Sequence, residues 1–86
     1  MQEPFNYSTN ALKQMDVRGI SKTIVFEVLH RPYAENWRDG GKERIYSQIE
    51  TIEGTDYLIR VFVDMEKTPM LVKTVHKTLN VRKYWK

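Results

Sequence analysis

The sequence predicts a single α+β domain in which two N-terminal helices pack on a four-stranded, mostly antiparallel meander sheet. Three observations predict this fold class. Apolar residues recur at helical spacing before Pro32, they alternate with polar residues after it, and glycine-containing turns separate the alternating segments. At 86 residues, 41% of them hydrophobic and 29% charged, the chain has room for one domain, 1–86, and one small core.

The first helix is expected over residues 9–17, after an N-terminal arm of residues 1–7. Ser8 can accept a hydrogen bond from the free backbone N–H groups of the first turn. Gly19 can adopt the left-handed conformation that commonly ends a helix. These two residues therefore mark the helix boundaries.

A second helix is expected over residues 22–30. Ser21 is placed to cap its start, and Pro32 prevents it from continuing past Arg31. His30 falls in the last turn, where a cation is favoured by the helix dipole. We therefore interpret His30 as a surface residue at the helix end rather than as a catalyst.

Four strands are expected to follow, over residues 33–38, 43–52, 56–63 and 70–78. Residues 39–41 and 53–55 contain glycines that allow tight turns, and residues 64–69 form a looser one. Consecutive hairpins predict a meander. Residues 79–86 are left as a basic C-terminal tail.

The core is expected to combine the apolar stripes of both helices with the inward residues of the sheet: Leu12, Met15, Ile24, Val28, Leu29, Ile45, Ile59, Val61 and Val63. With Ile45 and Ile49 turned toward the helices, strict alternation sends Arg44, Tyr46, Gln48, Arg60 and Phe62 to the open face. A mixed basic and aromatic surface can hold phosphates and stack bases. The alternative is that these side chains only pair with each other across strands.

The charge is unevenly distributed. Of the 14 lysines and arginines, five follow Pro69, where no acidic residue occurs, and the other nine are outnumbered by 11 acids. A basic terminus is expected of a nucleic-acid binder, because its cations displace counterions from phosphates. The alternatives are a solvated tail or a docking segment for an acidic protein.

Several classes of protein are disfavoured. The chain has no cysteine, which excludes disulfides and thiol catalysis, and a cytoplasmic location fits best. Neither a signal peptide nor a membrane-spanning segment is expected, because the N-terminus lacks a basic start and an apolar stretch, and no apolar run approaches about 20 residues. With two histidines, a multi-histidine metal site is not expected, and neither metal nor cofactor is predicted.

Several segments occur in a telling order: Tyr7-Ser8-Thr9-Asn10-Ala11, Val17-Arg18-Gly19-Ile20-Ser21, Glu27-Val28-Leu29 with Pro32, Gly41-Lys42-Glu43-Arg44-Ile45-Tyr46, Ile59-Arg60-Val61-Phe62-Val63-Asp64 and Val72-Lys73-Thr74-Val75-His76. Over about residues 7–78 the chain resembles a family of small bacterial domains related to the BrnT and RelE toxins. The resemblance implies a metal-independent ribonuclease fold and an antitoxin protein as partner. A core this small would also gain stability from a homodimer.

The resemblance also bears on single residues. Arg44, Thr74 and His76 match polar positions of BrnT-like domains, whereas Asn10 stands where the family usually has histidine. Asparagine can hydrogen-bond a phosphate or a base edge, but it cannot transfer a proton near neutral pH. The resemblance therefore implies weakened catalysis.

Metal-free RNA cleavage needs a base, an acid and cations that stabilise the charged phosphorane. We assign His76 as the acid or base, Arg44 and Arg60 as a phosphate clamp, and Thr74 as a hydrogen-bond donor. The residues expected to bind nucleic acid are Asn10, Tyr46, Lys73, Lys77, Arg82 and Lys83.

Two alternatives remain open for this site. His76 can instead be an ordinary strand residue, and the last strand is almost apolar on both faces, so that Val72, Thr74 and His76 could face the helices. Two functions follow from these readings. The first is a toxin-type endoribonuclease that acts on RNA, and the second is a non-catalytic nucleic-acid- or protein-binding module that kept the fold.

Overall fold

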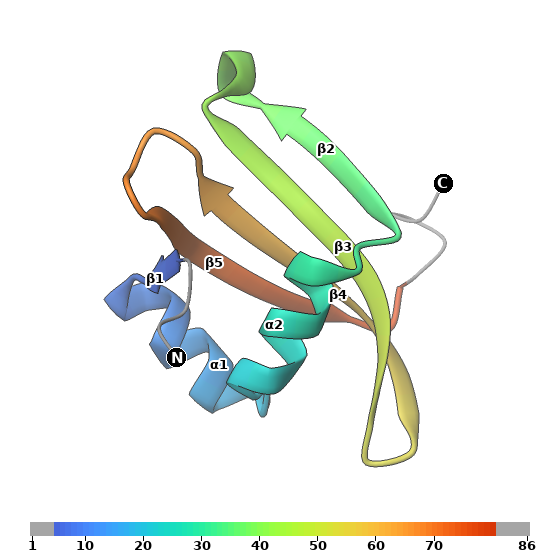
Figure 1. Ribbon diagram of the computed structural model, residues 1–86. Helices are drawn as coiled ribbons and strands as arrows, with labels where there is room; N and C mark the ends of the chain where they lie inside the picture. The colour runs from blue at the N-terminus through green and yellow to red at the C-terminus, as the bar shows by residue number, and fades with distance from the viewer. Residues whose placement is uncertain (1–4, 81–86) are drawn as a thin grey trace.

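The computed structural model describes residues 5–80 and confirms the α+β class (Figure 1). The strands form one five-stranded mixed sheet in the order β1-β5-β4-β3-β2, and both helices lie on the same face of it. The elements are β1 (Phe5–Tyr7), α1 (Thr9–Arg18), α2 (Lys22–His30), β2 (Ala34–Arg38), a short 3-10 turn η1 (Asp39–Gly41), β3 (Glu43–Ile52), β4 (Thr55–Asp64) and β5 (Met70–Thr78).

The prediction of four strands was wrong by one. Residues 5–7, expected as part of an arm, form β1, which pairs in parallel with the start of β5. The side chain of Phe5 is only 4% exposed and belongs to the core. A three-residue strand is too short to show alternation, and its partner lies at the other end of the sequence, so no local pattern reveals it.

Both helices begin as predicted, α2 also ends as predicted, and α1 extends one residue further than expected, to Arg18. The Ser8 hydroxyl accepts a hydrogen bond from the Ala11 N–H, and Gly19 ends α1 with a φ of 65°. The Ser21 hydroxyl accepts one from the Ile24 N–H at the start of α2. These caps satisfy backbone groups that helix ends leave without partners.

Helix α1 lies along the outer edge of β5, beyond the point where β1 ends. The Ser8 hydroxyl donates to the Lys73 carbonyl (2.9 Å), the Val75 N–H donates to the Gln14 side chain (2.9 Å), and the Arg18 guanidinium donates to the Val75 carbonyl (3.3 Å). An exposed strand edge is a site of aggregation. Side chains of α1 here take the place of a neighbouring strand.

The position of α1 explains one error in the predicted core. Leu12 is 43% exposed, because Ala11 and Met15, one turn apart, are the residues of α1 that face the sheet. Met15, Val28, Ile59, Val61 and Val63 are buried as predicted, and the half-buried Ile24 and Leu29 pack against them.

The turn between β3 and β4 contradicts the predicted faces of β3. The loop has two residues, Glu53 and Gly54, with φ values of 51° and 80°, rather than the three expected. A change of one residue in loop length exchanges the two faces of a strand. Arg44 and Tyr46 therefore lie on the helix side with Val61 and Val63, and Ile45, although buried, lies with Ile49 on the face away from the helices.

A β-bulge in β5 interrupts the alternation of its side chains between the two faces of the sheet. Phe62 pairs with Thr74 and Val63 pairs with Val72, so Lys73 is an extra residue between them. The bulge places Val72 in the helix-side core and Thr74 on the opposite face. The sequence left open which face of the last strand packs against the helices. Because of the bulge, Val72 faces the helices whereas Thr74 and His76 do not.

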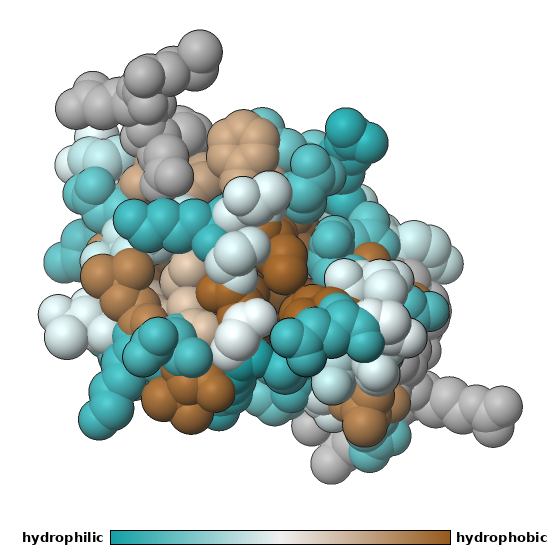
Figure 2. All heavy atoms as spheres, turned by 90° about the horizontal axis from the view of Figure 1, so that it is seen from below, coloured by the Kyte–Doolittle hydropathy of each residue, from teal (hydrophilic) through white to brown (hydrophobic). Residues whose placement is uncertain are grey.

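Exposed hydrophobic residues are scattered. Seen from below, hydrophobic surface is broken into separate patches by hydrophilic side chains (Figure 2). Such single exposed residues are normal on soluble surfaces. Neither described helix has the length and apolar character that a bilayer span requires.

Candidate nucleic-acid interface

The face of the sheet away from the helices brings together three of the four residues predicted for catalysis. Arg60 on β4 lies directly opposite His76 on β5, and the neighbouring Phe62 lies opposite Thr74. Directly opposed residues on antiparallel strands share a face and are close enough to interact. This arrangement agrees with the predicted grouping of Arg60, Thr74 and His76.

Two guanidinium groups flank the Phe62 ring. The Arg60 guanidinium carbon is 5.2 Å from the centre of this ring, and that of Arg38, on β2, is 5.7 Å from it. Cations at such distances are attracted to the ring face. We define Arg38, Arg60, Phe62, Thr74 and His76 as the Arg60 cluster.

The floor of this face is buried and mostly apolar. Ile45 is 3% exposed, Ser47 5% and Leu58 0%. Arg60, Phe62, Thr74 and His76 are half-buried by comparison. Side chains that are held in place but still accessible lose little entropy when a ligand binds.

The protonation of His76 depends on its surroundings. Burial lowers the pKa of His76 below its usual value of 6.5, and the positive charges of Arg18 and Arg60 lower it further. The imidazole is therefore neutral at pH 7 and is able to accept a proton. Among the residues predicted for the catalytic site, His76 has the only side-chain type whose ordinary pKa is near neutral.

The predicted phosphate clamp is not assembled, because Arg44 lies on the other side of the sheet from Arg60. Its guanidinium stacks on Trp37, 3.7 Å from the ring centre, and donates to the Glu35 carboxylate (3.1 Å) and to the Tyr46 hydroxyl (3.3 Å). The clamp prediction was thus wrong for Arg44, because the turn between β3 and β4 has two residues rather than the three expected.

Tyr46 also differs from its predicted role. It is 9% exposed and belongs to the helix-side core. Its ring therefore lies on the opposite side of the sheet from Arg60 and does not contribute to the predicted open-face surface. Phe62, which the sequence placed on the open face, is the aromatic residue that lies beside Arg60.

The two predicted phosphate-binding lysines contact other parts of the protein. The Lys73 ammonium donates to the Glu43 carboxylate (2.7 Å), and this hydrogen bond raises the pKa of Lys73. The Lys77 ammonium donates to the Arg18 carbonyl (2.5 Å) and lies 4.5 Å from the centre of the Tyr57 ring. Both ammonium groups therefore already use one of their three donors within the protein.

Asn10 is exposed in the first turn of α1, and its side-chain amide donates to the Lys73 carbonyl (3.4 Å). It therefore helps to hold α1 on β5, three residues before His76 in that strand. Arg82 and Lys83, also predicted to bind nucleic acid, lie outside the described residues.

Sequence reasoning missed Arg38 as a member of the cluster. Arg38 ends β2 opposite Glu43, with which it forms an ion pair of 3.4 Å. The pairing of β2 with β3 determines which residues of β2 lie on each face of the sheet. A prediction with a two-residue turn between β3 and β4 would therefore also have placed Arg38 on the same face as Arg60.

Within residues 5–80, no three His, Asp or Glu side chains are grouped so that they could hold a metal ion. Comparisons with protein-family models, with curated proteins and with solved structures found no match for this chain.

Proposed function

We propose that this chain is a cytoplasmic, RNA-directed protein whose fold resembles that of BrnT and RelE toxins, and that it contacts RNA through the Arg60 cluster. The observation that carries the proposal is the direct pairing of Arg60 with His76, beside the pair of Phe62 and Thr74. Arginine supplies a fork for a phosphate, and an accessible ring supplies a surface for a base.

On this proposal cleavage is weak or absent. A neutral His76 can serve as a base, but one imidazole does not readily serve as both acid and base. Arg44, which the sequence assigned to the phosphate clamp with Arg60, lies on the other side of the sheet. These two features favour the second candidate function, a non-catalytic binding module, over an efficient endoribonuclease with an antitoxin partner.

Binding is tested with a labelled single-stranded RNA and fluorescence anisotropy at several salt concentrations. Arg60→Gln should weaken binding and reduce the slope of log affinity against log salt by about one, because one phosphate contact is lost. Arg31→Gln removes the same charge from an exposed site at the end of α2 and should leave the slope unchanged. Equal effects of the two substitutions would contradict an interface at the Arg60 cluster.

Cleavage is tested by digestion of the same RNA with a chelator present. We expect little cleavage by the unmodified protein. Asn10→His, which restores the residue of the resembling family, should raise the rate, by about 10² to 10⁴ if the second imidazole takes part in proton transfer. His76→Ala in that background should remove the gain. Strong cleavage by the unmodified protein that survives His76→Ala would contradict this mechanism.

A further inference from the structure

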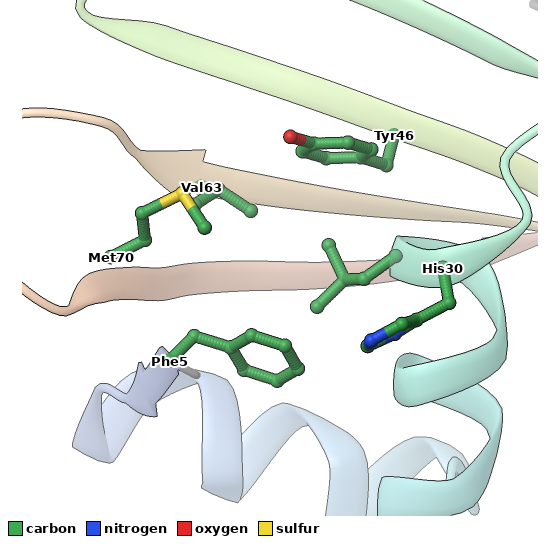
Figure 3. A pocket seen from close by; sticks show the side chains of 6 residues that line it. Phe5, His30, Tyr46, Val63 and Met70 are labelled. Atoms are coloured by element: carbon green, nitrogen blue, oxygen red, sulfur yellow. The ribbon is translucent and has the colours of Figure 1, made fainter. Parts of the chain in front are cut away.

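An apolar pocket of about 130 Å³ lies on the helix side of the sheet, on the opposite face from the Arg60 cluster. Five elements contribute to it, and Figure 3 shows Tyr46 on one side of the space and Phe5 and His30 on the other. The lining residues are Phe5, Leu29, His30, Tyr46, Val63 and Met70.

The pocket follows from the short length of α2. A helix of nine residues is about 13 Å long, whereas a strand of ten residues spans about 33 Å. Helix α2 therefore covers only part of the strands β3 and β4 on which it packs. The pocket lies where α2 ends at His30, and β1 closes its far side with Phe5.

The size and lining of the pocket indicate the class of ligand. An apolar cavity of about 150 Å³ in another protein accepts benzene, so a space of 130 Å³ suits a single six-membered ring. No lysine, arginine, aspartate or glutamate lines the pocket, which favours an uncharged ligand. The Tyr46 and Phe5 rings on its walls offer aromatic contacts, and Met70 can adjust its shape.

His30 adds one hydrogen-bonding position. Its ring stacks on Phe26 at 3.8 Å between ring centres, and its Nδ1 is 2.9 Å from the Phe26 carbonyl. A carbonyl only accepts, so Nδ1 carries the proton in this bond, and in the tautomer that has no second proton Nε2 is left as an acceptor. Figure 3 shows the nitrogen-bearing edge of the ring turned toward Phe5.

We propose that this pocket binds a small, uncharged, single-ring aromatic molecule that carries one hydroxyl group. The ring lies between Tyr46 and Phe5, and the hydroxyl donates to Nε2 of His30. This inference is independent of the proposed RNA-directed function, because it uses none of the residues of the Arg60 cluster.

The test is a titration of the ¹⁵N-labelled protein with phenol and with toluene, followed by two-dimensional NMR. We expect saturable shifts centred on residues that line the pocket. Met70→Phe fills the space and should weaken binding of both probes by at least tenfold. Met65→Phe makes the same change at a half-buried core residue that does not line the pocket, and should retain binding. Absence of saturable binding, or binding that Met70→Phe leaves unchanged in a folded protein, would overturn the proposal.

His30→Phe tests the hydrogen bond separately, because phenylalanine keeps the stacking on Phe26. The unmodified protein should bind phenol about 2- to 10-fold more tightly than toluene, the range expected of one hydrogen bond. His30→Phe should abolish this preference and leave toluene binding unchanged. Equal affinity for the two probes in the unmodified protein, or a preference that survives His30→Phe, would overturn the assigned ligand class.

Discussion

At the scale of single residues, the opposed positions of Arg60 and His76 couple the charge of one to the protonation of the other. The guanidinium groups of Arg60 and Arg18 both disfavour the imidazolium form. We therefore expect Arg60→Gln and Arg18→Gln each to raise the pKa of His76, measured by NMR titration of its ring protons. A pKa that stays constant in both variants would show that burial alone sets it.

The lowered pKa of His76 also predicts a pH dependence of stability. In the unfolded chain the imidazole regains its ordinary pKa of 6.5 and binds a proton more readily than in the folded protein. The free energy of unfolding should therefore fall as the pH drops below about 7, and this loss should level off below the folded-state pKa. Urea denaturation of the unmodified protein and of His76→Gln between pH 5 and 8 measures it. A loss on acidification that is just as steep in His76→Gln would assign it to other groups.

At the scale of single elements, the turn at Glu53 and Gly54 determines which residues of β3 face the helices. Both residues have positive φ, a conformation that favours glycine and asparagine. Gly54→Ala should lower the free energy of unfolding by about 1 kcal/mol, although a Cβ there meets no atom within 4 Å. Glu53→Asn should raise it by about 0.5 kcal/mol.

Chemical denaturation of these two variants measures both effects. Thr55→Ala, next to the turn, serves as a control for a small change in side chain without a change in backbone conformation. If Gly54→Ala proves as stable as the unmodified protein, the turn does not have the conformation described here.

The same turn shows what the sequence could and could not predict. The helices were predictable because Ser8, Gly19 and Ser21 mark their ends by local hydrogen bonding and backbone conformation. The hairpins were predictable from alternation and glycines. The faces of β3 were not, because they depend on whether the loop has two residues or three, and alternation alone does not distinguish these lengths.

The candidate site was predictable to the same extent. Arg60, Thr74 and His76 share a face because they lie on neighbouring strands with the expected alternation. The β-bulge at Lys73 places Thr74 and Val72 on opposite faces of the sheet, and no feature of the local sequence predicts this bulge. Arg44 was misplaced with the rest of β3, and Arg38 was missed because its face is set by pairing with that strand.

At the scale of the whole molecule, β1 pairs with the last strand of the sheet, β5, and Phe5 packs in the core. Phe5→Ala should lower the free energy of unfolding by about 3 to 5 kcal/mol, because it leaves a cavity between β5 and α2. Tyr33→Ala removes an aromatic ring that is 60% exposed and should cost much less. Chemical denaturation compares the two, and a loss below about 1 kcal/mol for Phe5→Ala would mean that residues 5–7 act as the arm that the sequence suggested.

The position of β1 beside β5 has a consequence for synthesis on the ribosome. Ser8 and Lys73, which are hydrogen-bonded in the folded protein, are separated by 65 residues in the sequence. The N-terminal strand is thus made early, and its partner emerges among the last described residues. At about 5 to 20 residues per second, β1 waits several seconds for β5, so the sheet cannot be completed in the nascent chain until the segment that contains Lys73 has emerged from the ribosome.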